Sequence, residues 1–196
     1  MPNLGIIASS ISGNLTSYDS IATTTLATSA SSITFSLIPS TYKHLQIRLF
    51  AQTNRGTYGG DNFYIRVGAS TVDSGSNYAW HMVYGNASGT GADKGTTATY
   101  INVLNGGCVG TTAGGSFGGV IVDLLDYANT SKYKTVRALG GTEDNAASAG
   151  GFGKAVGISS GLWQSTASAI DIISLYPMNG TLFNTYTSAA LYGIKG

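Results

Sequence analysis

The feature that most constrains the fold of this chain is an alternation of apolar and polar residues at every second position, which begins at Ser32. Successive side chains of a strand point to opposite faces, so this period predicts β-strands with one buried face. Ile33, Phe35 and Leu37 share one side of the first such segment, and Pro39 ends it. The alternation then returns between clusters of Gly, Asn, Ser and Asp, which are typical of turns.

Together the alternating segments predict about ten short strands. They cover Ile33–Leu37, Leu45–Phe50, Phe63–Val67, Tyr78–Tyr84, Thr97–Leu104, Gly118–Leu125, Thr135–Leu139, Ala155–Trp163, Ala169–Tyr176 and Ser188–Ile194. No apolar stripe at helical spacing is long enough for a substantial helix, and the 28 glycines oppose one further. The sequence therefore predicts an all-β fold, an antiparallel β-sandwich of jelly-roll type, because that architecture suits this number of strands.

Two regions are expected along the chain. Residues 31–196 carry the strand pattern and predict a single β-sandwich domain, with long polar connections at 70–77, 85–95, 106–115 and 140–153. Residues 1–30 hold few charges and predict an extended N-terminal arm. Its apolar anchors form the candidate subunit-contact set: Leu4, Ile6, Ile7, Ile11 and Leu15. We expect the arm to dock on a neighbouring subunit or on its own domain, and a frayed terminus is the alternative.

Composition excludes several classes of protein. The single cysteine, Cys108, leaves no partner for an intramolecular disulfide. The first residues lack the basic start of a secretory signal, and no run approaches the ~20 apolar residues of a membrane span, so we expect no membrane partner. Ten Lys and Arg against nine Asp and Glu give a net charge of +1 without a basic cluster, which argues against a nucleic-acid partner.

The low charge also favours a protein that meets other surfaces. Charged residues make up 10% of the chain, against ~25% in ordinary soluble domains. Uncharged Ser, Thr, Asn and Gly must then cover much of the surface, and such groups cost less to desolvate than ions. A weakly charged monomer is the alternative interpretation.

The motifs that suggest catalysis fail on their context. Residues 157–161 match the G-x-S-x-G string around Ser159, but they alternate like a strand instead of entering a helix. His44 and His81 both precede Ser159, whereas the histidine follows the serine in hydrolases with that motif. The glycine clusters at 114–119 and 150–154 open no helix and predict turns, not phosphate loops. We expect no enzyme and no catalytic residues.

The sequence predicts no metal site and no cofactor. Two histidines and one cysteine offer none of the spacings of zinc ligands. Two carboxylate pairs, Glu143 with Asp144 and Asp123 with Asp126, lie outside any calcium-binding loop pattern and are expected to be solvated or to cap loops.

One aromatic cluster is a candidate recognition surface. Tyr78, Trp80 and Tyr84 share one face of the segment 78–84, and His81 lies on the other. Core packing is the favoured interpretation of such alternating aromatics, and a glycan-binding or protein-binding surface is the alternative.

Several segments resemble a group of small virion structural proteins of tailed bacteriophages. The resemblance rests on residues Ser36–Arg48, Gly75–His81 and Ala190–Ile194, with similar strings at Ile7–Gly13 and Tyr18–Ala22. It implies a jelly-roll virion component assembled in the host cytoplasm. The resemblance does not say where in the particle the component lies. Because 196 residues hold a β domain and an arm without a segment for a fibre shaft, our leading hypothesis is a capsid decoration or cement protein, a homotrimer that contacts the major capsid protein or other virion subunits. A tail or tail-fibre module, which binds a host glycan through Trp80, is the alternative.

Overall fold

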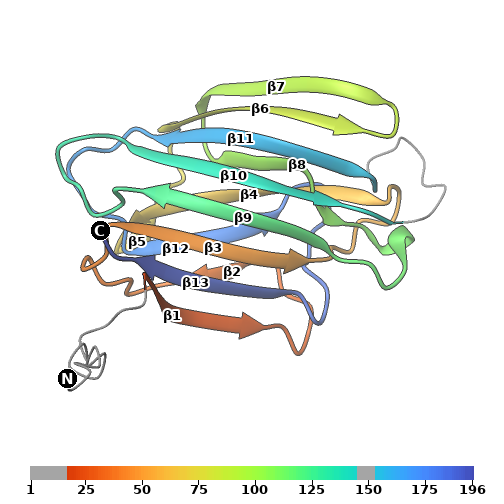
Figure 1. The fold of residues 1–196 in the computed structure, drawn as a ribbon, viewed down its shortest axis with the longest axis horizontal. Coiled ribbons are helices and arrows are strands. Elements are labelled where there is room, and N and C mark those ends of the chain that lie inside the picture. The colour runs from red at the N-terminus through yellow and green to blue at the C-terminus, as the bar shows by residue number, and fades with distance from the viewer. Residues whose placement is uncertain (1–16, 145–152) are drawn as a thin grey trace, which may run out of the picture.

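The computed structural model describes residues 17–144 and 153–196, which form thirteen strands (Figure 1). Their bounds are β1 Tyr18–Thr25, β2 Ile33–Phe35, β3 His44–Ala51, β4 Gly60–Ala69, β5 Thr71–Val72, β6 Tyr78–Asn86, β7 Gly89–Ala98, β8 Ile101–Val109, β9 Gly118–Leu125, β10 Lys134–Thr142, β11 Ala155–Trp163, β12 Ile172–Pro177 and β13 Ser188–Ile194. Within these residues the helical content is one 3₁₀ turn, Thr111–Ala113, and no helix is long and apolar enough to span a membrane. The prediction of an all-β fold is confirmed.

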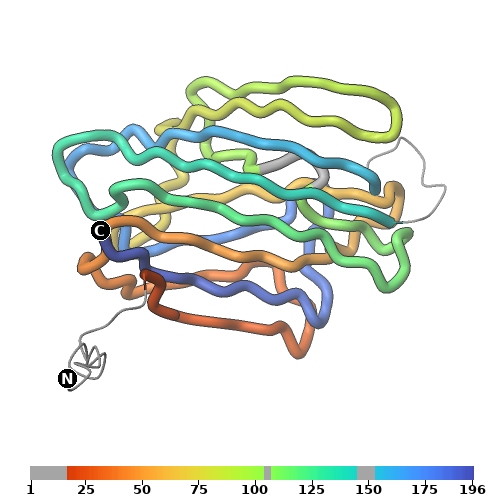
Figure 2. Tube along the Cα trace, in the orientation of Figure 1, coloured from red at the N-terminus to blue at the C-terminus, as the bar shows by residue number. Residues whose placement is uncertain are grey.

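The strands form two antiparallel sheets that face each other as a sandwich (Figure 1). The larger sheet has eight strands in the order β1-β13-β3-β9-β10-β11-β6-β7. The smaller sheet has the order β2-β12-β4-β5, and β8 also pairs with β4. Figure 2 shows how the two ends of the described chain meet, because β1 lies beside β13 at one edge of the larger sheet.

The core lies between the sheets and is built from alternate residues of the facing strands. On β3 the inward side chains Leu45, Ile47 and Leu49 are buried, while Arg48 and Phe50 are exposed. The smaller sheet contributes Phe63, Ile65 and Val67 of β4, none of which is exposed. The period-two pattern of the sequence therefore marks the core faces.

Three strands occur where the sequence predicted an arm and loops, the shortest being β5 within the predicted connection 70–77. The predicted arm 1–30 is corrected over residues 18–25, because β1 pairs with β13 along its length. The sequence YDSIATTT hides this strand because an edge strand needs only backbone pairing and half-burial, not an alternating apolar face. The connection predicted at 85–95 is corrected as well, since it lies within the β6–β7 hairpin.

Glycine explains why β7 escaped the sequence pattern. A Cβ on Gly95 would lie 2.4 Å from Nε1 of Trp80, and one on Gly91 would lie 2.6 Å from the hydroxyl of Tyr84. The two aromatic rings of β6 therefore cover the bare backbone of β7 and replace the side chains that a strand normally supplies.

A polar cluster around Asp73 fixes the loop before β6. The Asp73 carboxylate accepts hydrogen bonds from the indole of Trp163 at 2.8 Å, the amide of Asn77 at 2.9 Å and the Gly75 N–H at 2.8 Å. The buried hydroxyl of Tyr78 lies 2.8 Å from the Asp73 carbonyl and accepts the Val67 N–H at 3.1 Å. The residues 75–78, part of the string that carries the family resemblance, thus have a structural role in this loop.

Candidate subunit-contact face

The predicted contact residues of the arm, Leu4, Ile6, Ile7, Ile11 and Leu15, lie outside the described residues. Their role stays a prediction.

The aromatic set Tyr78, Trp80 and Tyr84 does not form a surface. Tyr78 is fully buried and Trp80 is 8% exposed, because the even-numbered residues of β6 point between the sheets. Tyr84 is half-buried against Gly91. The favoured interpretation, core packing, describes Tyr78 and Trp80, and the alternative of a recognition surface around Trp80 is corrected.

The serine of the G-x-S-x-G string also faces inward. Ser159 is 8% exposed, and its hydroxyl donates to the Val103 carbonyl. His81 pairs in register with Ser160, which lies on the opposite face of β11 from Ser159. His44 is engaged elsewhere, since its Nδ1 accepts the Asp126 N–H at 2.9 Å.

Carboxylates considered for metal binding have protein partners. Asp123 accepts the Gln46 amide at 2.9 Å and lies 3.4 Å from Arg137. Hydrogen bonds from Lys132 and Lys43 lower the pKa of Asp126, against the opposing effect of burial. Within the described part of the chain, no three His, Cys, Asp or Glu side chains gather in a way that would hold a metal ion.

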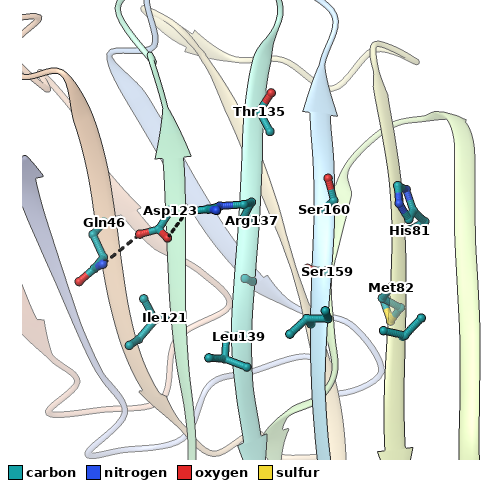
Figure 3. A pocket seen from close by; sticks show the side chains of 13 residues that line it. Gln46, His81, Met82, Ile121, Asp123, Thr135, Arg137, Leu139, Ser159 and Ser160 are labelled. Atoms are coloured by element: carbon teal, nitrogen blue, oxygen red, sulfur yellow. Dashed lines mark hydrogen bonds and ion pairs between the residues drawn. The ribbon is translucent and has the colours of Figure 1, made fainter.

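The outer face of the larger sheet, which points away from the core, carries a row of exposed aliphatic side chains. Strand register places them directly opposite one another from β9 across β10 and β11 to β6. We call this set the aliphatic row, and it comprises Ile121, Leu139, Ile158 and Val83, with exposed fractions of 42%, 55%, 53% and 51%. Figure 3 shows Ile121 and Leu139 side by side on β9 and β10.

A polar row runs parallel to the aliphatic row, one side-chain repeat away. It comprises Gln46, Asp123, Arg137, Ser160, His81 and Lys94, which are paired in register from β3 to β7. Figure 3 shows the bonds that join Gln46, Asp123 and Arg137. A shallow trough of 790 Å³ covers the polar and aliphatic rows together. Because Asp123 and Arg137 neutralise each other, the trough offers apolar contact beside little net charge.

On the other side of the aliphatic row, glycine occupies three of the six register positions. The register positions there are Phe50, Gly119, Gly141, Val156, Gly85 and Thr90, and we call this set the glycine row. A second depression of 480 Å³ covers its β11, β6 and β7 positions, Val156, Gly85 and Thr90, and reaches Leu139. A Cβ on Gly119 would meet nothing within 4 Å, so the surface at this position is open.

The exposure of the aliphatic row is costly in water. With Val156, which is 61% exposed, the row leaves on the order of 400 Å² of apolar surface in contact with solvent. Burial of that area is worth about 10 kcal/mol at 25 cal/mol per Å². The largest apolar patch of a protein surface commonly has about this size and is often functional.

The comparisons with known proteins leave the family of this chain open. No protein-family model and no curated protein matches it. A solved structure of CG-16, a homodimeric agglutinin from chicken liver, is 6% identical, with 81% of this chain and 98% of that chain covered and a TM-score of 0.33. The CBM2 module of the evolved Dit of Lactobacillus casei BL23 phage J-1 is 9% identical, with 84% and 70% covered and a TM-score of 0.17. At TM-scores this low, neither likeness says anything about the function of this chain.

The sequence contained one signal for this face that was not recognised as functional. Val156 and Ile158 alternate with Gly157 and Ser159 on β11, so apolar residues occupy the side that became the outer one. Alternation shows that two faces differ but does not show which one the second sheet covers.

Proposed function

We propose that this chain is a structural, non-enzymatic subunit that acts by contacting other protein subunits. The observation that carries the proposal is the aliphatic row, whose side chains remain half-exposed on an otherwise regular sheet. Exposure of these apolar side chains to water is unfavourable, and binding of another protein over them removes that unfavourable free energy. Following the resemblance to virion proteins, we propose a place in a bacteriophage particle, as a capsid decoration or cement protein.

We further propose that the sandwich is a jelly roll with two insertions. The eight strands of a jelly roll, named B to I in chain order, form sheets with the orders B-I-D-G and C-H-E-F. In this chain β1-β13-β3-β9 and β2-β12-β4-β8 follow those two orders. The remaining strands, β5–β7 and β10–β11, fall between E and F and between G and H. Jelly rolls are frequent in viral capsids, which agrees with the proposed role.

The insertions supply most of the contact face. Leu139, Ile158 and Val83 lie on β10, β11 and β6, which extend the larger sheet beyond β9. A jelly roll of eight strands lacks this surface, so the added strands extend the core on their inner side, through residues such as Trp80 and Val136, and give the chain an apolar face on their outer side. The extension of the larger sheet by β10, β11 and β6 therefore supports a role in assembly.

Binding of this kind stabilises a particle by mass action. A subunit that binds only the assembled lattice adds about 2.7 kcal/mol per site when its free concentration is 100 times its dissociation constant. Attachment through several copies at once raises the effective concentration further. We therefore expect particles with the protein to withstand heat and osmotic shock better than particles without it.

The experiment is to produce particles with the wild-type chain, with Leu139→Asp/Ile158→Asp, and with Leu37→Asp as the matched control. Leu37 is 92% exposed but follows β2, far in the fold from the aliphatic row. Purified particles are analysed by mass spectrometry and then heated. We expect the wild type and Leu37→Asp in the particles and the double variant missing or reduced. A wild-type chain that is absent from purified particles refutes the virion role.

One observation favours the alternative, a tail-associated module that binds a host glycan or receptor. On the outer face of the smaller sheet Tyr64 stacks on Tyr176 at 5.0 Å and lies 4.7 Å from Tyr100, while the Arg66 guanidinium lies 5.4 Å from the Tyr64 ring. Tyr and Arg are the residues most enriched at recognition hot spots. Glycan-array binding that Tyr176→Ala abolishes and Tyr84→Ala retains would support this role over the capsid role.

A further inference from the structure

We propose that the outer face of the larger sheet binds a second copy of the same chain, in a two-fold dimer in which the aliphatic row of each copy lies in the glycine row of the other. This inference rests on the proposed function, because it names the partner of the face described above. The occupant follows from the shape of the surface. The aliphatic row and the glycine row, which lacks side chains on β9, β10 and β6, lie side by side on one face, and a two-fold axis brings each row onto the other.

Strand register defines which residues would meet. An axis that runs along the rows and passes over Val120 and Gly140 places each strand antiparallel to its own copy. On β9, Ile121 then faces the partner's Gly119, and on β10, Leu139 faces the partner's Gly141. Val83 of β6 faces the partner's Gly85 in the same way. Three of the four side chains of the aliphatic row thus meet a position that has no side chain.

The strand β11 differs from its neighbours because its low row holds Val156. There Ile158 faces the partner's Val156, and two exposed apolar side chains pack at the centre of the interface. Stacked sheets lie about 10 Å apart, which leaves room for one layer of interdigitated side chains.

The flanking residues are also complementary under this axis. If the register of β10 continues two residues past Gly141, Arg137, which also pairs with Asp123, faces the partner's exposed and oppositely charged Glu143. Arg48, whose guanidinium lies over the Tyr192 ring, faces the partner's Phe50, which is 51% exposed and stacks on Phe117. Stacked sheets rotate by about 30° relative to each other, so the pairs on the central strand β10 hold this register best.

The size of the face is sufficient for a specific dimer. Six strands from β3 to β7 span about 24 Å at 4.8 Å per strand, and four side-chain repeats along them span about 25 Å. The product, about 600 Å² per copy, approaches the ~800 Å² of a standard interface. We therefore expect a reversible dimer whose population rises with concentration.

The first test is the oligomeric state of the purified wild-type chain, measured by analytical ultracentrifugation over a concentration range on the order of a hundredfold. We expect a monomer–dimer equilibrium. A monomer at every concentration overturns the inference, and so does a trimer, the state expected for a cement protein in the sequence analysis.

The second test places a side chain in the glycine row. Gly119→Leu adds apolar surface at an open position, so a merely adhesive face would associate more strongly. The proposed dimer, in which the aliphatic row lies in the glycine row, predicts the opposite. Its dissociation constant should rise by at least about tenfold, because the introduced side chain would collide with the partner's Ile121. Dimerisation that is unchanged or stronger overturns the arrangement. If urea titration shows that Gly119→Leu is poorly folded, Gly85→Leu replaces it, since a Cβ there has Thr90 Cγ2 at 3.9 Å as its nearest contact.

The third test restores the fit. Gly119→Leu combined with Ile121→Ala exchanges ridge and groove on β9, so we expect dimerisation to return toward the wild-type value. A double variant as weak as Gly119→Leu alone overturns the assignment of facing residues. Leu37→Asp, exposed but outside the face, is expected to dimerise like the wild type.

These results are separable from the proposed function. A wild-type chain that enters particles but stays monomeric in solution overturns only the dimer. A dimer that never enters particles refutes only the virion role.

Discussion

Asp61 is the residue whose replacement should most weaken the fold. Its side chain has no exposed surface, and its carboxylate accepts five hydrogen bonds. Oδ1 accepts from the Asn62 N–H at 2.8 Å and from the N–H and side-chain amide of Asn179 at 3.1 and 2.8 Å. Oδ2 accepts from the Thr53 hydroxyl at 2.8 Å and the Gly180 N–H at 2.9 Å. The carboxylate thereby ties the start of β4 to the loop between β12 and β13.

The magnitude follows from what Asp61→Asn leaves behind. In Asp61→Asn an NH₂ group replaces one carboxylate oxygen and faces the N–H and O–H groups that donated to it. Of these groups only the Thr53 hydroxyl is able to rotate and accept a hydrogen bond instead. At least one buried N–H, such as that of Gly180, loses its acceptor at about 1–3 kcal/mol, and the remaining bonds lose their charge at about 1 kcal/mol or more together. We expect a loss of about 2–4 kcal/mol in the free energy of unfolding, and a fall in melting temperature of roughly 4–16 °C for a chain of this size.

Urea titration followed by tryptophan fluorescence measures this loss, with the slope of the transition checked for constancy. Asp93→Asn is the matched control, because Asp93 is exposed and its carboxylate accepts one backbone N–H, that of Lys94. We expect the control to change stability by less than about 0.5 kcal/mol. If Asp61→Asn costs less than about 1 kcal/mol, the carboxylate does not hold these two segments together and the reasoning is wrong.

Three further predictions concern β6 and its neighbours. Burial raises the pKa of Asp73, but hydrogen bonds from Trp163, Asn77 and Gly75 outweigh it and lower the pKa. The stability that these bonds give is present at neutral pH and lost as pH falls below about 4, so urea titrations should show a smaller decrease in the free energy of unfolding from pH 5 to pH 3 for Asp73→Asn than for the wild type. An equal loss in both proteins would contradict this. Tyr78→Phe removes the buried hydroxyl that bonds Val67 and Asp73 and should cost about 1–2 kcal/mol by the same assay, whereas no change would mean that water satisfies those groups in the wild type. Gly95→Ala places a Cβ 2.4 Å from the Trp80 indole and should cost about 1–3 kcal/mol, while Gly119→Ala, with open space, should stay within about 0.5 kcal/mol; equal effects would show that Trp80 does not depend on the bare backbone of β7.

The alternation of apolar and polar residues located the strands that bury one face, but not the two edge strands of the larger sheet. Period-two segments located most strands, including β3, β9, β11 and β13, because a strand that buries one face must alternate. The same rule missed β1 and β7, because each is an edge strand without a fully buried face. Their pairing depends on backbone hydrogen bonds that any residue except proline can make.

The order of residues along the chain was enough to predict the fold class, the lack of a substantial helix and the two unlike faces of most strands, since these depend on residues that are close in sequence. Which face is covered became visible only in the folded molecule. Trp80 and Val83 both sit on β6, yet one is buried in the core and the other faces solvent in the aliphatic row. A sheet has two sides, and the side that becomes the interior depends on where a second sheet, built from distant segments, comes to pack.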